Sequence, residues 1–212
     1  MYLPSHFEEA HVDVLHSLIR SRPLATLITM TTEGVEANHI PLQLDAGTGE
    51  FGTLCGHVAR ANRFWYEHPA GAPVLAIFHG PDSYISPSWY ASKKTHGKVV
   101  PTWNYAVVHA RARLRVIDDP DWLLRHLAAL TDAHEAGFPA PWAVADAPRE
   151  FTEGLLTAIV GIELTITALT GKWKASQNQP EVNRAGIVAG LRERGDASAS
   201  AMAALVERGV AQ

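Results

Sequence analysis

The sequence predicts an α+β fold that is mainly β, an antiparallel barrel with peripheral helices and a helical C-terminal segment. Several extended runs are joined by short turns, and the regular alternation of strand and helix that parallel folds require is missing. The 212 residues, 47% of them hydrophobic, are enough for one sizeable core. We therefore expect a single domain over residues 1–212, with a helical appendage from about residue 172.

The first elements follow from periodicity and turn residues. Ser5 and Glu8 have the spacing of a capping box, and apolar residues then recur at helical intervals before Pro23. A helix is expected over residues 6–20. Extended apolar runs separated by turn residues then predict a β-hairpin and a third strand. These three strands are expected at residues 24–30, 37–44 and 51–55.

The middle of the chain predicts more strands and one long loop. Gly80-Pro81 is expected to interrupt the fourth strand, at residues 74–78, before a short resumption at 83–85. Residues 86–102 contain prolines and lysines and are expected to form a loop, whose aromatic content favours an ordered wall over a disordered tether. Residues 61–68, which precede the fourth strand, are expected to form a short helix.

Residues 106–117 alternate between an apolar face and a basic face that carries Arg111, Arg113 and Arg115. Such a basic face is most often solvated, although in a dimer it could form a band for an anionic partner. Asp119 and Pro120 then have the residue types of a helix start. The apolar stripe expected for that helix consists of Leu123, Leu124, Leu127 and Leu130. The remaining elements are expected at residues 151–159 (helix), 161–168 (strand), 182–191 and 197–207 (both helices).

The third strand is expected to stop where phosphate-binding residue types gather. His57, Arg60 and Asn62 fall within six residues, so their side chains can converge on one anion beside the backbone N–H groups of a turn. Neither the glycine–lysine pattern of a P-loop nor the glycine pattern of a dinucleotide-binding fold is present. Alternatively, Arg60 and His57 could cap a short helix or face solvent.

Bulk properties limit the function classes. The formal charge of −4 and the pI near 6.2 supply no global attraction for nucleic acid, so DNA binding would need a local basic patch. Cys55 is the single cysteine, no secretory signal is recognisable, and no apolar run approaches the ~20 residues of a membrane span. We expect a cytoplasmic protein. The eleven histidines lack the spacing of a metal site, whereas a lone axial histidine for haem would leave no motif.

Six runs of the sequence, in order along nearly the whole chain, resemble the PaiB family, whose members are described as FMN-binding negative transcriptional regulators. Pro-Ser-Trp-Tyr and Pro-Thr-Trp-Asn-Tyr are long and rare enough to be specific. The six runs are PLATL (residues 23–27), ANHIPL (37–42), GTLCGHVARAN (52–62), YISPSWY (84–90), VVPTWNY (99–105) and GKWKASQN (171–178).

The resemblance implies a flavin-binding split barrel, related in fold to pyridoxamine phosphate oxidases, that works as a homodimer with FMN at the subunit interface. It also implies that the strand around His39 lies along the isoalloxazine and that the turn around Arg60 holds the phosphate. From their chemistry, Trp103 and Asn104 offer a plane and an amide for the flavin ring. The predicted cofactor-binding residues are Asn38, His39, Ile40, Pro41, Thr53, Leu54, His57, Arg60, Asn62, Lys98, Thr102, Trp103 and Asn104.

Two function classes stay open at this point. One is an FMN-bound repressor that acts on genes directly or indirectly. The other is a flavin-dependent oxidoreductase or a haem-binding or haem-degrading relative. No residue set calls for an acid, base or nucleophile, so we predict no catalytic side chain, and any chemistry would belong to the flavin. Trp89 is expected to be a core or interface residue.

Overall fold

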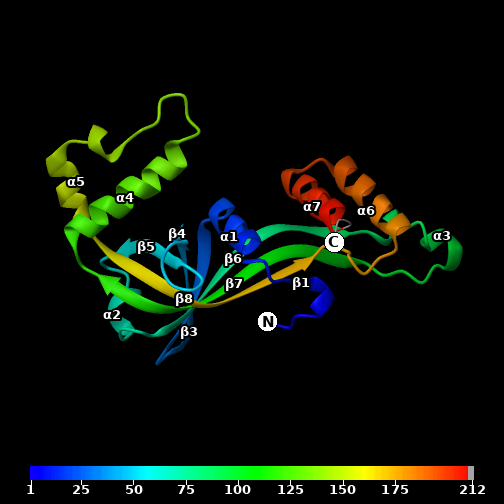
Figure 1. Cartoon of the computed structure of the whole chain (residues 1–212), viewed down its shortest axis with the longest axis horizontal. Coiled ribbons are helices and arrows are strands. Elements are labelled where there is room, and N and C mark those ends of the chain that lie inside the picture. The colour runs from blue at the N-terminus through cyan, green and yellow to red at the C-terminus, as the bar shows by residue number, and fades with distance from the viewer. Residues whose placement is uncertain (210–212) are drawn as a thin grey trace. The chain divides into compact units, whose positions relative to one another are not determined.

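The computed structural model describes residues 1–209 and confirms the predicted fold class: an antiparallel sheet of eight strands with peripheral helices (Figure 1). The hydrogen-bonded order is β3-β2-β6-β7-β8-β5-β4, and β1 pairs with β8 beside this path. The strands are β1 (Glu8–Glu9), β2 (Leu24–Thr31), β3 (Gly34–Pro41), β4 (Gln43–Asp45), β5 (Thr53–Ala59), β6 (Pro73–Ile85), β7 (Thr102–Ile117) and β8 (Ile159–Lys174).

The helices lie near the predicted places with shifted ends. The first begins at Val12 and not near residue 6, because Ser5–Phe7 is a 3-10 turn and Glu8 enters β1, where it pairs with Lys172. Asp119 caps its helix as predicted, accepting hydrogen bonds from the next two N–H groups. The α-helices are α1 (Val12–Ser21), α2 (Phe64–Glu67), α3 (Lys93–His96), α4 (Pro120–Glu135), α5 (Arg149–Leu156), α6 (Glu181–Arg194) and α7 (Ala197–Arg208).

Several strands are longer than the sequence indicated. The interruption expected at Gly80-Pro81 was wrong: β6 runs through both residues. A Cβ atom at Gly80 would lie 2.8 Å from the Leu18 side chain and 3.0 Å from that of Ala106, so the glycine lets the strand pass close to both. Strand β7 already begins at Thr102, and β8 continues to Lys174, which places the GKWK run in the sheet and not in the helical appendage.

The described chain divides into two compact units. One comprises residues 19–78 and 109–169, and the other comprises residues 1–18, 79–108 and the chain from 170 onward. Strands β6, β7 and β8 contribute residues to both. The single-domain organisation stays a prediction, and each unit is described by itself.

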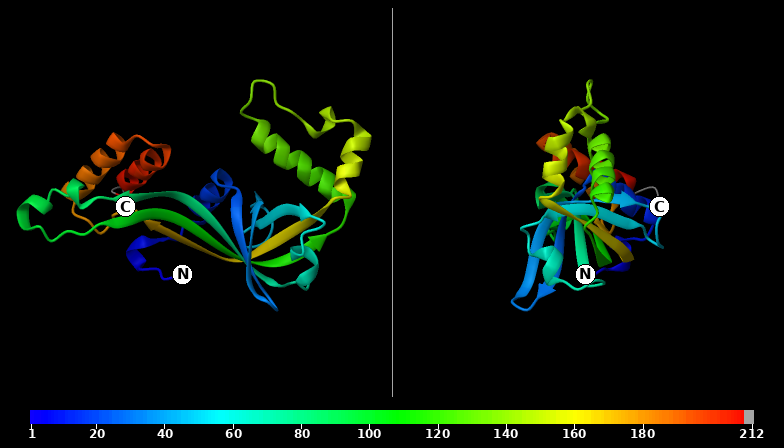
Figure 2. Two further views of the ribbon diagram at one scale, coloured as in Figure 1. Left: turned by 180° about the vertical axis from the view of Figure 1, so that it is seen from behind. Right: turned by 90° about the vertical axis from the view of Figure 1, so that its left-hand side faces the viewer.

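In the unit of residues 19–78 and 109–169, the sheet curls until β5 meets the end of β3. A Cβ atom at Gly56 would lie 2.7 Å from the Leu42 side chain and 3.2 Å from the carbonyl oxygen of Pro41. The missing side chain therefore permits the close approach of the two strands. Helices α4 and α5 of the same unit lie side by side (Figures 1 and 2).

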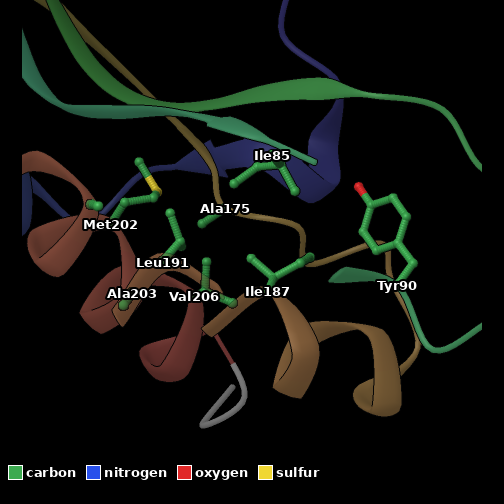
Figure 3. Close-up of a cluster of buried hydrophobic side chains, with 9 residues drawn as sticks. Ile85, Tyr90, Ala175, Ile187, Leu191, Met202, Ala203 and Val206 are labelled. Atoms are coloured by element: carbon green, nitrogen blue, oxygen red, sulfur yellow. The ribbon is translucent and has the colours of Figure 1, made fainter. Parts of the chain in front are cut away.

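The other unit has its own core, formed where α6 and α7 meet the ends of β6 and β8 (Figure 3). Trp89 is partly buried against this core and contacts the backbone of α6 at Gly186 and Gly190, as expected for a core residue. The buried residues of the cluster are Ile85, Tyr90, Ala175, Ile187, Leu191, Ala199, Met202, Ala203 and Val206.

Gly190→Ala should destabilise the protein by about 1–3 kcal/mol, because the new Cβ would overlap the Trp89 indole ring. Gly154→Ala is the matched control: it also lies within a helix, but no atom lies within 4 Å of its Cβ position. The control should gain roughly 0.5–1 kcal/mol from helix propensity. Urea denaturation followed by circular dichroism measures both effects, and a neutral Gly190→Ala would contradict the packing argument.

Candidate functional site

The predicted turn begins four residues later than expected, because β5 pairs with β8 as far as Ala59↔Ile159. His57 therefore lies on the strand, and Arg60 is the first residue beyond it. The backbone N–H of Arg60 donates to the carbonyl oxygen of Ala158 at 2.7 Å. The Trp65 indole N–H donates to the carbonyl oxygen of Arg60 at 2.8 Å, which fixes the turn from the other side.

The Arg60 side chain is engaged with the protein itself. Its Nη atoms contact the two carboxylate oxygens of Asp118 at 3.0 and 2.5 Å. Its Nε donates to the carbonyl oxygen of Thr157 at 2.8 Å, and Nη2 also donates to that of Ile159 at 3.1 Å. The hydrogen bond from Arg60 lowers the pKa of Asp118. Within residues 1–209, four of the five guanidinium N–H groups are used in this way and one remains for a ligand.

An amide pair joins the turn to β3. Asn62 Nδ2 donates to Asn38 Oδ1 at 2.9 Å, and Asn62 Oδ1 accepts from the backbone N–H of Phe64 at 2.9 Å. The structure therefore brings together the two runs that the resemblance assigned to the flavin. Along β3, His39 and Pro41 are exposed, whereas Ile40 is buried in the core.

Alternation along β5 separates its predicted residues. Thr53, Cys55 and His57 share one face of the strand, and Leu54 is fully buried on the other. Burial, together with the Glu163 carboxylate, raises the pKa of the Cys55 thiol to about 11. The thiol is therefore neutral at physiological pH.

His57 meets a second histidine, which the sequence analysis did not single out. His57 Nδ1 lies 3.2 Å from Nε2 of His126 on α4, and the His126 ring stacks on Trp122. His126 is only 6% exposed, and within the described chain its Nδ1 is buried without a hydrogen-bond partner. Burial lowers the pKa of His57, and burial together with the neighbouring His57 lowers the pKa of His126 to about 4. Both rings are neutral at pH 7.

Beside this pair, α4 and the β4–β5 ladder enclose a pocket of about 400 Å³. This is within the usual range for small-molecule sites, and its lining combines an aromatic ring, a guanidinium and a carboxylate. The lining residues are Gln43, Leu44, Asp45, Cys55, Trp122, Arg125 and His126.

Four predicted residues belong to the other unit. Asn104 is fully buried, where its side chain exchanges hydrogen bonds with the Ser176 hydroxyl at 2.9 and 3.2 Å. Thr102 accepts a short hydrogen bond from Lys174. Trp103 is 55% exposed, and Lys98 is exposed in the loop before β7. Asn104 thus has a structural partner, while the Trp103 ring is open to contact.

Two residues that contact the predicted phosphate-binding residues were missed for different reasons. Asp118 lies 58 positions after Arg60, and no local pattern pairs the two. His126 carried a usable signal, since it falls three residues after Leu123 on the buried side of α4. The predicted stripe instead included Leu124, which is 41% exposed. That assignment was wrong, and the buried position belongs to His126.

The curled antiparallel sheet with peripheral helices defines a protein of the split-barrel class. A family model described as "Putative FMN-binding domain" matches residues 1–168, and the chain belongs to this family. An uncharacterised protein of Emericella nidulans is 33% identical, over 99% of this chain and 98% of its own. The protease synthase and sporulation protein PAI 2 of Bacillus subtilis is 27% identical over 98% and 97%, which confirms the PaiB resemblance.

Solved structures agree on the fold. The FAD and heme binding protein from Mycobacterium smegmatis superimposes with a TM-score of 0.60 at 19% identity, covering 86% of this chain and 80% of that one. FMN is the cofactor that the family assigns to this chain. Within residues 1–209, no helix is long and apolar enough to cross a membrane.

The end of β5 and the turn after it carry groups whose chemistry suits a phosphate. These are a neutral imidazole at His57, the remaining N–H of Arg60 and the amide of Asn62. Asp118 opposes a phosphate and shares Arg60, which weakens this anchor without removing it. When bound, FMN supplies the capacity to accept and pass on electrons, and the protein residues orient it.

The neutral His126 predicts a pH dependence of stability. Because its pKa is about 4 in the folded protein and 6.5 in a model peptide, the unfolded chain binds more protons between these values. The free energy of unfolding should therefore fall as the pH drops from 6.5 to 4, by on the order of 3 kcal/mol. His126→Leu should flatten this slope. Leu123→Ala, a core truncation on the same helix, should lower stability at every pH and leave the slope unchanged.

Proposed function

We propose that this protein is an FMN-binding homodimer of the PaiB type that acts as a negative regulator in the cytoplasm. The observation that carries the proposal is the hydrogen bond between Asn62 and Asn38, which joins the predicted phosphate turn to the predicted flavin strand. The phosphate would be held by His57, Arg60 and Asn62, and the isoalloxazine would lie along residues 38–41. Membership in the FMN-binding family supports this assignment.

The remaining predicted contacts belong to the same proposal. On β5, Thr53 lies on the same face of the strand as His57. Its hydroxyl would add a second polar side chain to the contacts on that face. In the other unit, the predicted residues Trp103 and Lys98 are exposed. Buried Leu54 and Asn104 would contribute by fixing the strands that carry their neighbours.

An FMN titration followed by flavin fluorescence tests the phosphate anchor. Arg60→Ala should weaken FMN binding on the order of tenfold or more, because it removes a charge-assisted hydrogen bond. Asp118→Asn should strengthen binding, since it removes the carboxylate that competes with phosphate. Arg192→Ala is the control, because Arg192 pairs with Glu207 on α7 and neither residue contacts the predicted site.

The two variants separate the possible failures. A purified protein that takes up no FMN would contradict the proposed function. If neither Arg60→Ala nor Asp118→Asn changes the affinity for FMN, the phosphate does not bind at Arg60, and the proposed anchor is wrong.

An apolar face of the β2–β3 hairpin supports the homodimer. Met30 and Val35 stand directly opposite each other across the two strands and are 67% and 68% exposed, and Leu24 on the same face is 60% exposed. The free end of this hairpin projects from the neighbouring strands (Figure 2). Exposed apolar residues on a strand face are typical of an interface, and a second copy would cover them.

The double variant Met30→Glu/Val35→Glu should convert the dimer into a monomer, because it places charges in the proposed interface. Phe151→Glu is the control, since Phe151 is similarly exposed, at 59%, but lies on α5. Sedimentation equilibrium measures the mass of each. A monomeric parent protein, or a double variant that remains dimeric, would contradict the proposed interface.

Repression by this chain is proposed to be indirect. In the basic face of β7, Arg115 Nε donates to Glu163 at 2.8 Å, and Arg113 donates to the carbonyl oxygen of Gly71 at 3.0 Å. Part of that charge is therefore already neutralised, and the net charge is −4.

Fluorescence anisotropy with labelled duplex DNA should accordingly detect no binding by the FMN-loaded protein at physiological salt. Salt-sensitive binding that Arg111→Ala abolishes would instead support direct repression.

A further inference from the structure

The contact between His57 and His126 allows only certain proton positions. The two nitrogens, 3.2 Å apart, form a hydrogen bond in which one ring must donate and the other accept. His126 has one remaining nitrogen, Nδ1, which is buried and has no partner in the described part of the chain. The protonation of that nitrogen decides which ring donates.

A third histidine, His68, also has a buried ring nitrogen without a hydrogen-bond partner among the described residues. His68 Nδ1 lies 2.9 Å from the carbonyl oxygen of Phe64, and a carbonyl oxygen can only accept. Nδ1 of His68 therefore carries a proton, and in the ring with a single proton that proton is on Nδ1. Its Nε2, which is buried without a partner among the described residues, is then a bare lone pair. An unpaired buried acceptor is tolerated more often than an unpaired buried N–H.

The same reasoning applies to His126. If its Nε2 accepted the bond from His57, its Nδ1 would be a buried N–H without a partner, the costlier arrangement. His126 Nε2 therefore carries the proton and donates to His57 Nδ1. Because His57 Nδ1 then accepts, the single proton of the neutral His57 ring is on Nε2. Within residues 1–209, that Nε2 has no protein partner and is not among the buried nitrogens.

The orientation of His126 is itself fixed. Its ring stacks on Trp122 with a centroid separation of 5.2 Å and an interplanar angle of 16°. The Trp122 indole N–H donates to Glu163 Oε1 at 3.1 Å, and the ring lies against the backbone of Gly161, where a Cβ atom would overlap it. A continuous series of contacts thus leads from β8 through α4 to His57.

We propose that His126 is a positioning residue that holds His57 in the Nε2–H tautomer, as a neutral donor for an acceptor oxygen of the ligand at this turn. This inference rests on the proposed function in one respect only, namely that the oxygen belongs to the FMN phosphate. The opposite tautomer would present a lone pair to the phosphate and would repel it. Because His126 fixes this tautomer, the neutral His57 ring can donate a hydrogen bond to the ligand without first taking up a proton from solvent.

Two-bond ¹H–¹⁵N NMR of the histidine rings tests the tautomers in the full chain at pH 7 without FMN. We expect Nε2–H for His57 and His126, and Nδ1–H for His68, which serves as the internal reference. An Nδ1–H tautomer or an imidazolium at His57 would overturn the proposal, whether or not FMN binds.

Two variants add a test that simple packing would not pass. In His126→Gln the side-chain amide can still donate to His57, so the Nε2–H signal should remain. In His126→Leu the donor is lost, and His57 should become a mixture of tautomers. Titration with FMN should then show several-fold weaker binding for His126→Leu and near-parental binding for His126→Gln, with riboflavin, which lacks the phosphate, unaffected.

The outcomes separate the two proposals. Equal losses of FMN affinity in His126→Gln and His126→Leu would show that His126 acts only through packing, and would overturn the inference. The expected tautomers in a protein that takes up no FMN would support the inference and contradict the proposed function. If His126→Leu does not fold, the spectrum of the parent protein still decides the tautomer.

Discussion

The antiparallel pairing of β5 with β8 is the constraint on which the candidate site depends. It runs without a break from Thr53 to Ala59 and ends where β8 begins. Because the ladder continues that far, His57 is held on a strand and points to α4, and the chain turns only at Arg60. The carbonyl oxygens that Arg60 contacts, those of Thr157 and Ile159, lie at this same end of the ladder.

This arrangement gives the turn two donors of different character. The Arg60 guanidinium carries a full charge but shares it with Asp118, so a ligand gains only part of its attraction. His57 carries no charge, but its proton position is fixed by a buried neighbour. A site of this kind binds through preorganised geometry more than through net charge. Binding of this kind does not require a net positive charge, and the formal charge of this chain is −4.

The sequence predicted what local patterns encode. Alternation located the strands, the Asp119-Pro120 pair located the start of α4, and rare motifs indicated the FMN family. It failed where the deciding contact lies far along the chain. Strand β6 continues through Gly80-Pro81, where the glycine permits a close approach to Leu18 and Ala106, and β5 extends because of its pairing with β8. The Asp118 partner of Arg60 could not be foreseen for the same reason.

The protonated thiol of Cys55 on β5 affects how readily the protein reacts with oxidants. Peroxide attacks the thiolate, and a pKa of about 11 leaves very little of Cys55 in that form at neutral pH. As Cys55 is the single cysteine, no disulfide can form within one chain either. Peroxide is therefore expected to oxidise Cys55 only slowly.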